Sequence, residues 1–383
     1  LGDVYKRQDF VDMLKLRASY GIGGNIGRNT APYLIASYYD SSLVDGMAGS
    51  VNTPPNKDIR WEKTTTVNVG VDFALFRHRL SGTIEYYNKY SVDLLAAING
   101  SPTQGFGYTT LMTNNGKMVN RGVEITLSGE IIRQKDFSWN ASLLYAFNRN
   151  KVKHISVQPS LWDSRISMPT SYPMVGKPLY GIYAYKWAGL NENGDPQVYD
   201  AENNVTSGPA RDYHALVYCG TTVPIHNASL TNVLRYKGFE FSAMLILDAG
   251  HKLRSSNIPS INMSNGRITS TAKGIVDRWT QPGDVTDVPR LLFSNDTENF
   301  NTHRTELYRY SDLFVYDASN IRLSNISLAY RVPAHWCKKI SLSGARLQFN
   351  VENVATFAFD SKANYDLGGK VKPNYVWGLY LNF

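Results

Sequence analysis

Residues capable of catalysis or metal binding occur in the chain, but not in the spacings that such chemistry requires. The sequence has no HExxH zinc motif, no GxSxG nucleophile elbow and no phosphate-binding Walker loop. Its seven histidines are dispersed, and Cys219 and Cys337 stand far apart without a CxxC or Cys/His spacing. We therefore expect no enzymatic activity, no cofactor, no metal site and no disulfide framework.

Two short stretches contain residue types that hold ligands in other proteins. The stretch "GIGGNIG", residues 21–27, is rich in glycine but lacks the dinucleotide-binding spacing. The stretch "NENGDP", from Asn191, offers oxygen ligands suited to calcium but lacks the sixth-position glycine and the distal glutamate of an EF-hand. Both are predicted to be turns, because Asn-Gly and Asp-Pro pairs interrupt regular structure.

Composition excludes several classes of protein. The 383 residues include 25 tyrosines and 30 glycines, and no uninterrupted apolar run is longer than five residues, as in "AMLIL" from Ala243 to Leu247. A membrane-spanning helix needs about 18 or more apolar residues, so none is expected. The formal charge is +8, but Lys and Arg are scattered among acids instead of gathering with aromatic residues, so we expect no nucleic-acid partner.

A strict alternation of apolar and polar residues is the main structural signal. In "VNVGVDFAL", the residues Val67, Val69 and Val71 face one way, and Asn68 and Asp72 face the other. The pattern recurs in "VEITLSGEI", "FSWNASLLYAFN", "FEFSAMLIL" and "RLQFNVEN". In "NIRLSNISLAY" the phase slips between Leu323 and Ile326, which predicts a β-bulge.

The alternating segments predict about ten strands. They lie at roughly 11–20, 61–75, 79–94, 117–132, 136–150, 226–236, 238–250, 315–332, 341–356 and 373–383. Tight connections ("FRHR", "RQKD", "YKG", "PAHWCKK") alternate with long ones (21–60, 95–116, 151–225, 251–314, 357–372). An antiparallel sheet with short turns at one end and long loops at the other is typical of a transmembrane β-barrel; a β-sandwich, the alternative, does not predict it.

The barrel hypothesis assigns the polar positions to a water-filled lumen and the apolar positions to lipid. Glu124, Glu130, Arg346 and Glu352 are expected to face the lumen, either to shape selectivity there or simply as the polar lining of a water-filled barrel. The strand aromatics are expected to form a girdle at the membrane interface, although stacking on sugar rings is an alternative. These aromatic residues include Trp61, Tyr86, Tyr87, Trp139, Tyr145 and Trp187.

Several colinear stretches resemble motifs of the SusC/RagA-type TonB-dependent transporters of Bacteroidota outer membranes. They are "LKLRASYGIGGN" (14–25), "IRWEKTTTVNVGVDFALFRHRLSGTIEYYNK" (59–89), "NNGKMVNRGVEITLSG" (114–129), "DFSWNASLLYAFNRNKV" (136–152), "VGKPLYGIYAYKWAGLNENGDPQVYD" (175–200) and "SNIRLSNISLAYRVP" (319–333). The resemblance covers nearly the whole chain after residue 10.

The resemblance implies an all-β fold, namely a plugged barrel of roughly 22 strands of which this chain supplies the last ten. It implies import of glycans or peptides across the cell outer membrane, a SusD-like lipoprotein as partner, and energy from TonB. A structural or adhesive barrel without transport is the alternative. The plug domain, the TonB-contacting segment and the signal peptide are expected upstream of the sequence. Residues 1–8, "LGDVYKRQ", resemble adaptor read-through, so the native part is expected to be 9–383.

The stretch "NYVWGLYLNF" predicts a last strand that ends on an apolar face. Tyr375, Trp377, Leu379, Leu381 and Phe383 occupy every second position and are expected to face lipid. Terminal aromatics at this spacing resemble the carboxyl-terminal signal that the barrel assembly machinery reads in outer-membrane proteins. A buried edge strand is the alternative.

Deleting Phe383 is expected to impair assembly more than deleting a girdle aromatic such as Tyr86, because only the first change removes part of the proposed signal. Surface level of the full-length protein in intact cells is the measurement. Normal surface levels without Phe383 would refute the signal interpretation.

Overall fold

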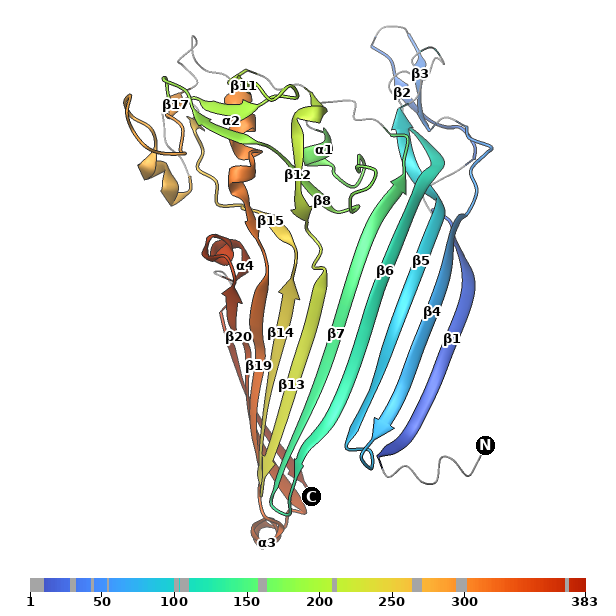
Figure 1. Cartoon of the computed structure of the whole chain (residues 1–383), viewed down its shortest axis with the longest axis vertical. Helices are drawn as coiled ribbons and strands as arrows, with labels where there is room; N and C mark the ends of the chain where they lie inside the picture. The colour runs from blue at the N-terminus through green and yellow to red at the C-terminus, as the bar shows by residue number, and fades with distance from the viewer. Residues whose placement is uncertain are drawn as a thin grey trace.

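The computed structural model describes residues 10–27, 32–42, 45–53, 55–99, 103, 110–157, 164–208, 212–263, 271–293, 302–368 and 372–383. The largest element is one ten-stranded sheet in which every strand pairs antiparallel with the next long strand along the chain (Figure 1). Its strands are β1 (Val11–Asn25), β4 (Glu62–Leu75), β5 (Leu80–Asn99), β6 (Thr110–Arg133), β7 (Phe137–His154), β13 (His226–Tyr236), β14 (Phe239–Ala249), β19 (Asn320–Arg331), β20 (Gly344–Ala358) and β21 (Asn374–Asn382). The expected adaptor residues 1–8 lie outside the described residues.

The predicted strand order and the polarity of the connections are confirmed. The short connections, at 76–79, 134–136, 237–238 and 332–343, lie together at the lower end of the sheet, and the long ones lie at the upper end (Figure 1). The predicted bulge is also confirmed, because the register of β19 shifts between Leu323 and Asn325 against β20.

Four predictions of local structure were wrong. The stretch "GIGGNIG" is not a turn, because residues 21–25 continue β1 and pair with β4. Residues 315–317 do not begin β19 but form β18 (Val315–Asp317), which pairs with β15 (Lys252–Arg254). The stretch "PAHWCKK" is not a bare turn, because it contains the short helix α3 (Ala334–Cys337) and the start of the 3-10 turn η6 (Lys338–Ile340). Much of the predicted loop 95–116 continues β5 and β6 as a hairpin, with register shifts between Ser91 and Leu95 that bend it.

Register gives the sheet two chemically distinct faces. One row of directly paired residues crosses nine strands and is apolar throughout: Leu16, Val71, Ile84, Ile125, Tyr145, Ala228, Leu247, Ile321 and Phe357. The next row lies one residue nearer to the short turns on every strand and is mainly polar: Lys15, Asp72, Thr83, Thr126, Leu144, Ser229, Ile246, Arg322 and Thr356. Every strand therefore contributes its alternate residues to the same two faces.

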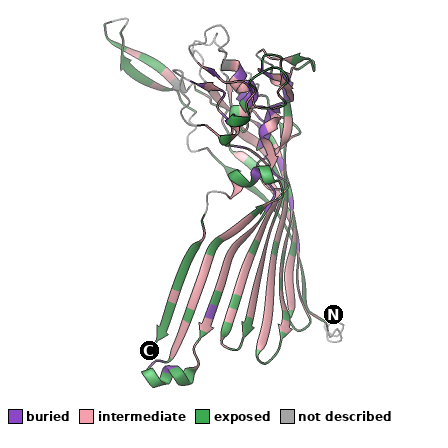
Figure 2. Cartoon of the chain, turned by 90° about the vertical axis from the view of Figure 1, so that its left-hand side faces the viewer, coloured by how far each residue is buried: buried purple, intermediate pink, exposed green. Residues whose placement is uncertain are grey.

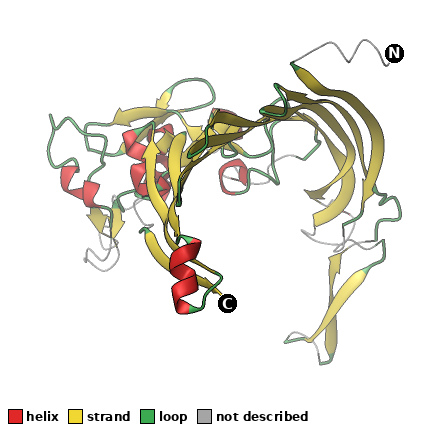
Figure 3. Cartoon of the chain, turned by 90° about the horizontal axis from the view of Figure 1, so that it is seen from below, coloured by secondary structure: helices red, strands yellow, loops and turns green. Residues whose placement is uncertain are grey.

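The apolar face is open to the surroundings. Leu16 is 74% exposed, Tyr20 70% and Trp377 78%, although a water-soluble sandwich would cover such residues with a second layer. Seen from below, the sheet curves into an arc whose two edges, β1 and β21, do not meet (Figure 3). An arc with an exposed apolar face and a polar face is the wall of a transmembrane β-barrel, with lipid on the apolar side.

The long connections at the upper end fold into a compact unit, here called the outer domain, formed by the described residues of 164–225 and 251–318. Its elements are α1 (Ser164–Ser167), β8 (Gly181–Tyr185), β9 (Trp187–Leu190), β10 (Pro196–Tyr199), β11 (Val205–Thr206), η3 (Tyr213–Ala215), β12 (Leu216–Thr221), β15, β16 (Asn262–Met263), η4 (Lys273–Asp277), β17 (Leu292–Phe293), α2 (Thr302–Arg309), η5 (Asp312–Phe314) and β18. Buried residues gather here and are rare in the sheet (Figure 2). Tyr183, Tyr185, Val198 and Leu307, each at most 1% exposed, form its core.

Three further pieces complete the upper end. The hairpin β2 (Ile35–Asp40) and β3 (Met47–Thr53) projects from the connection between β1 and β4, apart from the outer domain (Figure 1). The 3-10 turn η7 (Ser361–Ala363) and the short helix α4 (Asn364–Leu367) follow β20.

Among the described residues, no helix combines the length and the apolar character that a membrane span requires.

Arginine at Val69 is expected to lower the free energy of unfolding by about 2–4 kcal/mol, the cost of an arginine facing lipid near the bilayer midplane. Val69 pairs with Ala18 and Tyr86 on the apolar face, whereas Asn68 pairs with Ser19 and Tyr87 on the polar face, so Asn68→Arg is the matched control. Folding of the full-length protein into lipid vesicles is the measurement. Equal tolerance of both arginines would overturn the assignment of the faces.

Candidate functional site on the inner wall

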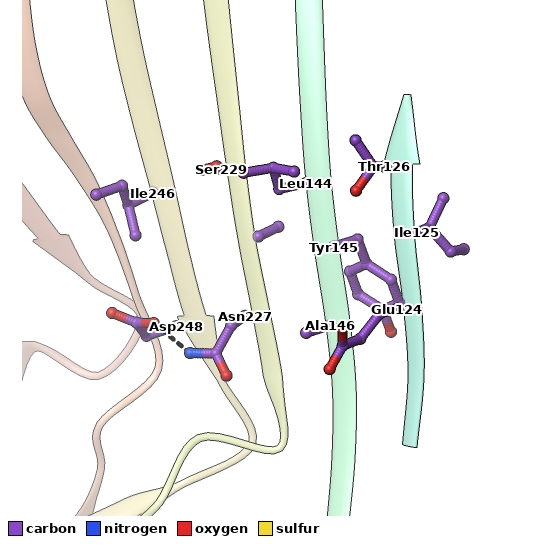
Figure 4. Close-up of a pocket in the computed structure, with 11 residues that line it drawn as sticks. Glu124, Ile125, Thr126, Leu144, Tyr145, Ala146, Asn227, Ser229, Ile246 and Asp248 are labelled. Atoms are coloured by element: carbon purple, nitrogen blue, oxygen red, sulfur yellow. Dashed lines mark hydrogen bonds between the residues drawn. The ribbon is translucent and has the colours of Figure 1, made fainter. Parts of the chain in front are cut away.

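The polar face of the sheet is the candidate site, because in a barrel it lines the lumen through which a solute passes. Two neighbouring rows of the polar face, in which polar and apolar side chains are mixed, line a shallow pocket of about 320 Å³ across β6, β7, β13 and β14 (Figure 4). At its lower edge in Figure 4, Asn227 Nδ2 donates a 2.7 Å hydrogen bond to Asp248 Oδ1. Glu124 faces the same pocket and makes no hydrogen bond or ion pair with any residue that the structure describes. The pocket therefore offers carboxylate and amide groups to a solute.

A charged cluster holds the wall at β1, β4 and β5. Arg17 donates from Nε to Asp72 Oδ2 at 2.7 Å and from Nη2 to Glu85 Oε1 at 2.5 Å. Thr83 Oγ1 donates a further 3.0 Å bond to Asp72. Gly70 makes room for this cluster, because a Cβ there would lie 3.0 Å from Glu85 Cγ and 3.3 Å from Arg17 Nη2. Alternation predicts that these charges share a face, but not that one arginine joins two carboxylates.

A second charged cluster lies near the lower end of the wall. Glu240 accepts hydrogen bonds from Arg235 at 2.7 Å and from Arg346 at 3.1 Å. A small hollow of about 110 Å³ beside it is also lined by Lys237 and Arg331, so cations outnumber the single carboxylate. The lower lumen wall is therefore locally positive.

The predicted lumen residues are confirmed in their facing but do not form one site. Glu124 and Glu130 both lie on β6, opposite Ala146 and Asn140 of β7. Arg346 and Glu352 lie far round the arc on β20, and Glu352 is opposite Asn325. These side chains line different parts of the wall.

The predicted aromatic girdle needs two corrections. Tyr86 lies on the apolar face as expected, but the adjacent Tyr87 lies on the polar face, where it packs over Gly122 so closely that a Cβ at that glycine would clash with its ring. Trp187 belongs to the outer domain, where its Nε1 donates a 2.9 Å hydrogen bond to Asp287 and its ring packs against Tyr308. Trp139 and Tyr145 stay on the apolar face.

Four of the five expected assembly-signal residues lie on one face of β21, at the edge of the sheet, and Phe383 follows the last residue of that strand. Tyr375, Trp377, Leu379 and Leu381 pair with residues of β20 whose side chains share the apolar face, such as Phe349 and Leu347. They are exposed by 66%, 78%, 62% and 42%, and Phe383 by 93%. The proposed recognition of these residues remains a prediction.

The outer domain is fixed by a charged network that the sequence does not reveal. The "NENGDP" turn is confirmed: Asn191 Oδ1 accepts hydrogen bonds from the backbone N–H of Asn193 and Asp195, and Gly194 adopts a φ of +74°. The turn presents Asp195 to two arginines. Arg290 binds it through two hydrogen bonds of 3.1 and 2.8 Å, and Arg304 donates from Nε at 3.1 Å. Burial lowers the pKa of the Arg304 guanidinium, and Asp195 opposes that effect.

A polar junction joins the outer domain to β14 and β19. Lys252 Nζ donates a 2.9 Å hydrogen bond to Asp317, and the backbone N–H of Ser319 donates to the same carboxylate at 2.8 Å. Burial works to raise the pKa of Asp317, but the hydrogen bonds from Ser319 and Lys252 outweigh it and lower that pKa to about 2. Burial lowers the pKa of the neighbouring His251. The junction thus holds an ionised carboxylate at any physiological pH.

Within the described part of the chain, no three His, Cys, Asp or Glu side chains come together as a metal-binding group. The sheet has a polar inner face with charged clusters and an apolar outer face, and the outer domain lies at its upper end. These features define an outer-membrane β-barrel wall.

Comparison with known proteins agrees with this class. The model of the family described as "TonB dependent receptor-like, beta-barrel" matches residues 1–354. The chain is 26% identical over 401 residues to TonB-dependent receptor P3 of Formosa agariphila, covering 98% of this chain and 38% of that protein. It is 26% identical over 361 residues to TonB-dependent receptor SusC of Bacteroides thetaiotaomicron, covering 89% of this chain and 34% of that protein. The chain belongs to the TonB-dependent receptor β-barrel family, whose members lie in the outer membrane.

Solved structures show the same fold. A chain in the structure of the RagAB peptide transporter superposes with a TM-score of 0.78 at 23% identity, covering 100% of this chain and 42% of that chain. The RagAB peptide importer in its open-open state gives a TM-score of 0.74 at 21% identity. The chain therefore spans less than half the length of these relatives.

Replacing Asp195 by alanine is expected to destabilise the outer domain by about 2–4 kcal/mol, because it leaves the buried Arg304 without its carboxylate. Asp195 keeps 21% of its side chain exposed, so the expected cost lies at or below that of a fully enclosed pair. The measurement is protease resistance of the outer domain on intact cells. Asp212→Ala is the control, because Asp212 is half exposed and its ion pair is with the exposed His214. Equal protease resistance in both variants would contradict a stabilising role for the network.

Proposed function

We propose that this chain is the carboxyl-terminal part of the barrel of an energy-coupled importer of large nutrients, either glycans or peptides. The observation that carries the proposal is the two-faced sheet of a TonB-dependent receptor family member, with a polar inner wall below a folded outer domain. A polar lumen gives a solute a wetted path, and the outer domain forms part of the surface that the solute meets first. Transport needs binding and movement only, so no catalytic group is required.

In this proposal, the energy source and the protein partners of the importer are those that membership of the family implies. TonB would act through a plug domain supplied by sequence upstream of this chain, and a SusD-like surface lipoprotein would deliver the substrate. One relative is named SusC, and one matched structure is titled as the RagAB peptide transporter. These names support, for this chain, a paired receptor, and the second supports peptides as its cargo.

Assembly completes the proposal. The apolar face of the sheet contacts outer-membrane lipid, and the barrel assembly machinery recognises the aromatic face of β21 through Tyr375, Trp377, Leu379, Leu381 and Phe383. Support comes from the exposure of all five side chains at the edge of the sheet.

A structural or adhesive barrel without transport is the second candidate. The exposed hairpin β2–β3, with Tyr38 72% and Met47 69% exposed, is the observation that favours an adhesive role. The ordered charges of the inner wall favour transport, because adhesion places no demand on lumen-facing residues.

Affinity purification of the tagged full-length receptor from outer membranes is expected to retain a SusD-like lipoprotein encoded beside it. Uptake of the cognate nutrient is expected to stop when either the receptor gene or the TonB gene is deleted. A tagged outer-membrane barrel of another family is the control for retention. Uptake that persists in both deletion strains would exclude import and leave the adhesive role.

A further inference from the structure

A mainly apolar pocket lies at the outer end of the inner wall, separate from the pocket of Figure 4. Its volume is about 420 Å³, within the range of about 300–1,000 Å³ that is typical of ligand sites. It lies where the outer ends of β5, β6 and β7 meet the connection 170–179. The apolar residues of its lining are Leu94, Leu95, Ala96, Met112, Met118, Val152, Ile155, Pro173 and Leu179.

Register places this pocket on the lumen side of the wall. Met118 pairs with Ser91 of β5 and with Val152 of β7, and Ser91 pairs with Thr64 of β4. This row lies two residues beyond Lys89, Asn120 and Asn150, which belong to the polar face. The pocket therefore opens toward the solute path and not toward lipid.

Hydrogen bonds hold the walls of the pocket in place. The backbone N–H of Val152 donates to Lys177 O at 2.9 Å, and the N–H of Gly176 donates to Val152 O at 2.9 Å, so the connection pairs with the end of β7. Asn150 joins both sides, because its Nδ2 donates to Met118 Sδ at 2.8 Å and its Oδ1 accepts from Leu179 N at 2.7 Å. A site held in this way needs little rearrangement to bind a ligand.

The mouth of the pocket carries one carboxylate, that of Glu62, and one ammonium, that of Lys117. Both carboxylate oxygens of Glu62 accept hydrogen bonds within the protein, one from the backbone N–H of Leu95 and one from Asn25 Nδ2, each at 2.9 Å. Lys117 is exposed at the mouth and makes no hydrogen bond or ion pair with any described residue. Asp93 interacts with its charge at longer range but is itself paired with Arg60 at 2.6 Å. An anionic group of a ligand can reach the ammonium of Lys117 without displacing a protein partner.

The chemistry of the lining disfavours sugars. Glycan sites use aromatic platforms beside polar groups. This lining has polar residues, namely Glu62, Lys117, His154, Thr170 and Ser171, but no Phe, Tyr or Trp. A sugar hydroxyl placed against Leu, Met and Val side chains would lose its hydrogen bonds to water without replacement, which costs free energy. Two methionines instead give an adaptable surface for apolar side chains of varied shape.

We propose that this pocket is a substrate subsite that binds a bulky apolar peptide residue, with Lys117 binding the peptide carboxylate next to it. The proposal rests on the proposed import function and narrows its cargo from glycans or peptides to peptides. Fatty acids share the apolar and carboxylate chemistry, so they serve as an arm of the test.

Binding is tested with the full-length receptor in lipid nanodiscs and fluorescent short peptides. A peptide ending in two leucines with a free carboxylate is expected to bind about tenfold more tightly than its carboxamide, the difference expected of one charge-assisted hydrogen bond. Replacing the leucines by serines is expected to weaken binding roughly 10- to 100-fold, because leucine burial is lost. A malto-oligosaccharide is expected not to compete.

Variants assign the binding to this pocket. Lys117→Met is expected to abolish the difference between acid and amide, and Met118→Gln, which keeps an acceptor for Asn150, is expected to reduce the difference between leucine and serine. Lys153→Met is the matched control, because Lys153 is an exposed lysine of β7 that does not line the pocket. Wild-type selectivity in both pocket variants, competition by the oligosaccharide, or tighter binding of decanoate than of the peptide would each overturn the proposal.

TonB-dependent uptake is measured separately, so the two proposals can fail independently. Uptake of a nutrient that the pocket variants leave unchanged would remove the subsite and keep the import function. Peptide binding that depends on Lys117, without any TonB-dependent uptake, would support the subsite and remove the import function.

Discussion

The constraint on which this structure depends is that backbone groups in hydrocarbon must find their hydrogen-bond partners within the sheet. Ten strands meet this constraint, except along the outer edges of β1 and β21, by pairing in sequence order, and register then decides which side chains share a face. The apolar row from Leu16 to Phe357 stays in phase over nine strands. A one-residue slip at any strand would put its charged residues into lipid, so every cluster on the inner wall depends on this register.

Sequence alone predicts the sheet well because period-two alternation is a local signal. It predicts the ten strands, the grouping of the short turns at one end of the sheet and the bulge after Leu323, because each of these features depends only on residues that are close together in the sequence. It did not predict the left-handed turn at Phe76, Arg77 and His78, whose φ values lie between 57° and 62° although none of them is glycine. Pairing of the flanking strands imposes that conformation, and flanking strands are not a local property.

The outer domain contains contacts that no local sequence pattern predicts. Its core joins Tyr183 and Val198 to Leu307, more than a hundred residues further along the chain, and no period marks these positions in the sequence. Asp195 was correctly placed in a turn, but its arginine partners lie 95 and 109 residues away. The charged clusters of the inner wall are predicted only in part. Alternation predicts which face Asp72 and Glu85 occupy, but it does not predict that Arg17 forms ion pairs with both of them.

The two halves of the molecule are stabilised by different means. The outer domain buries its own apolar residues, whereas the sheet keeps Leu16, Tyr20 and Trp377 exposed and relies on lipid to cover them. The sheet also has two edges, β1 and β21, each paired on one side only. Leu14, Leu16 and Tyr20 occupy alternate positions on β1 and share one face. Any strand that pairs with the open edge of β1 must therefore place its apolar residues opposite these, because the alternative register would turn the polar face of that strand toward lipid.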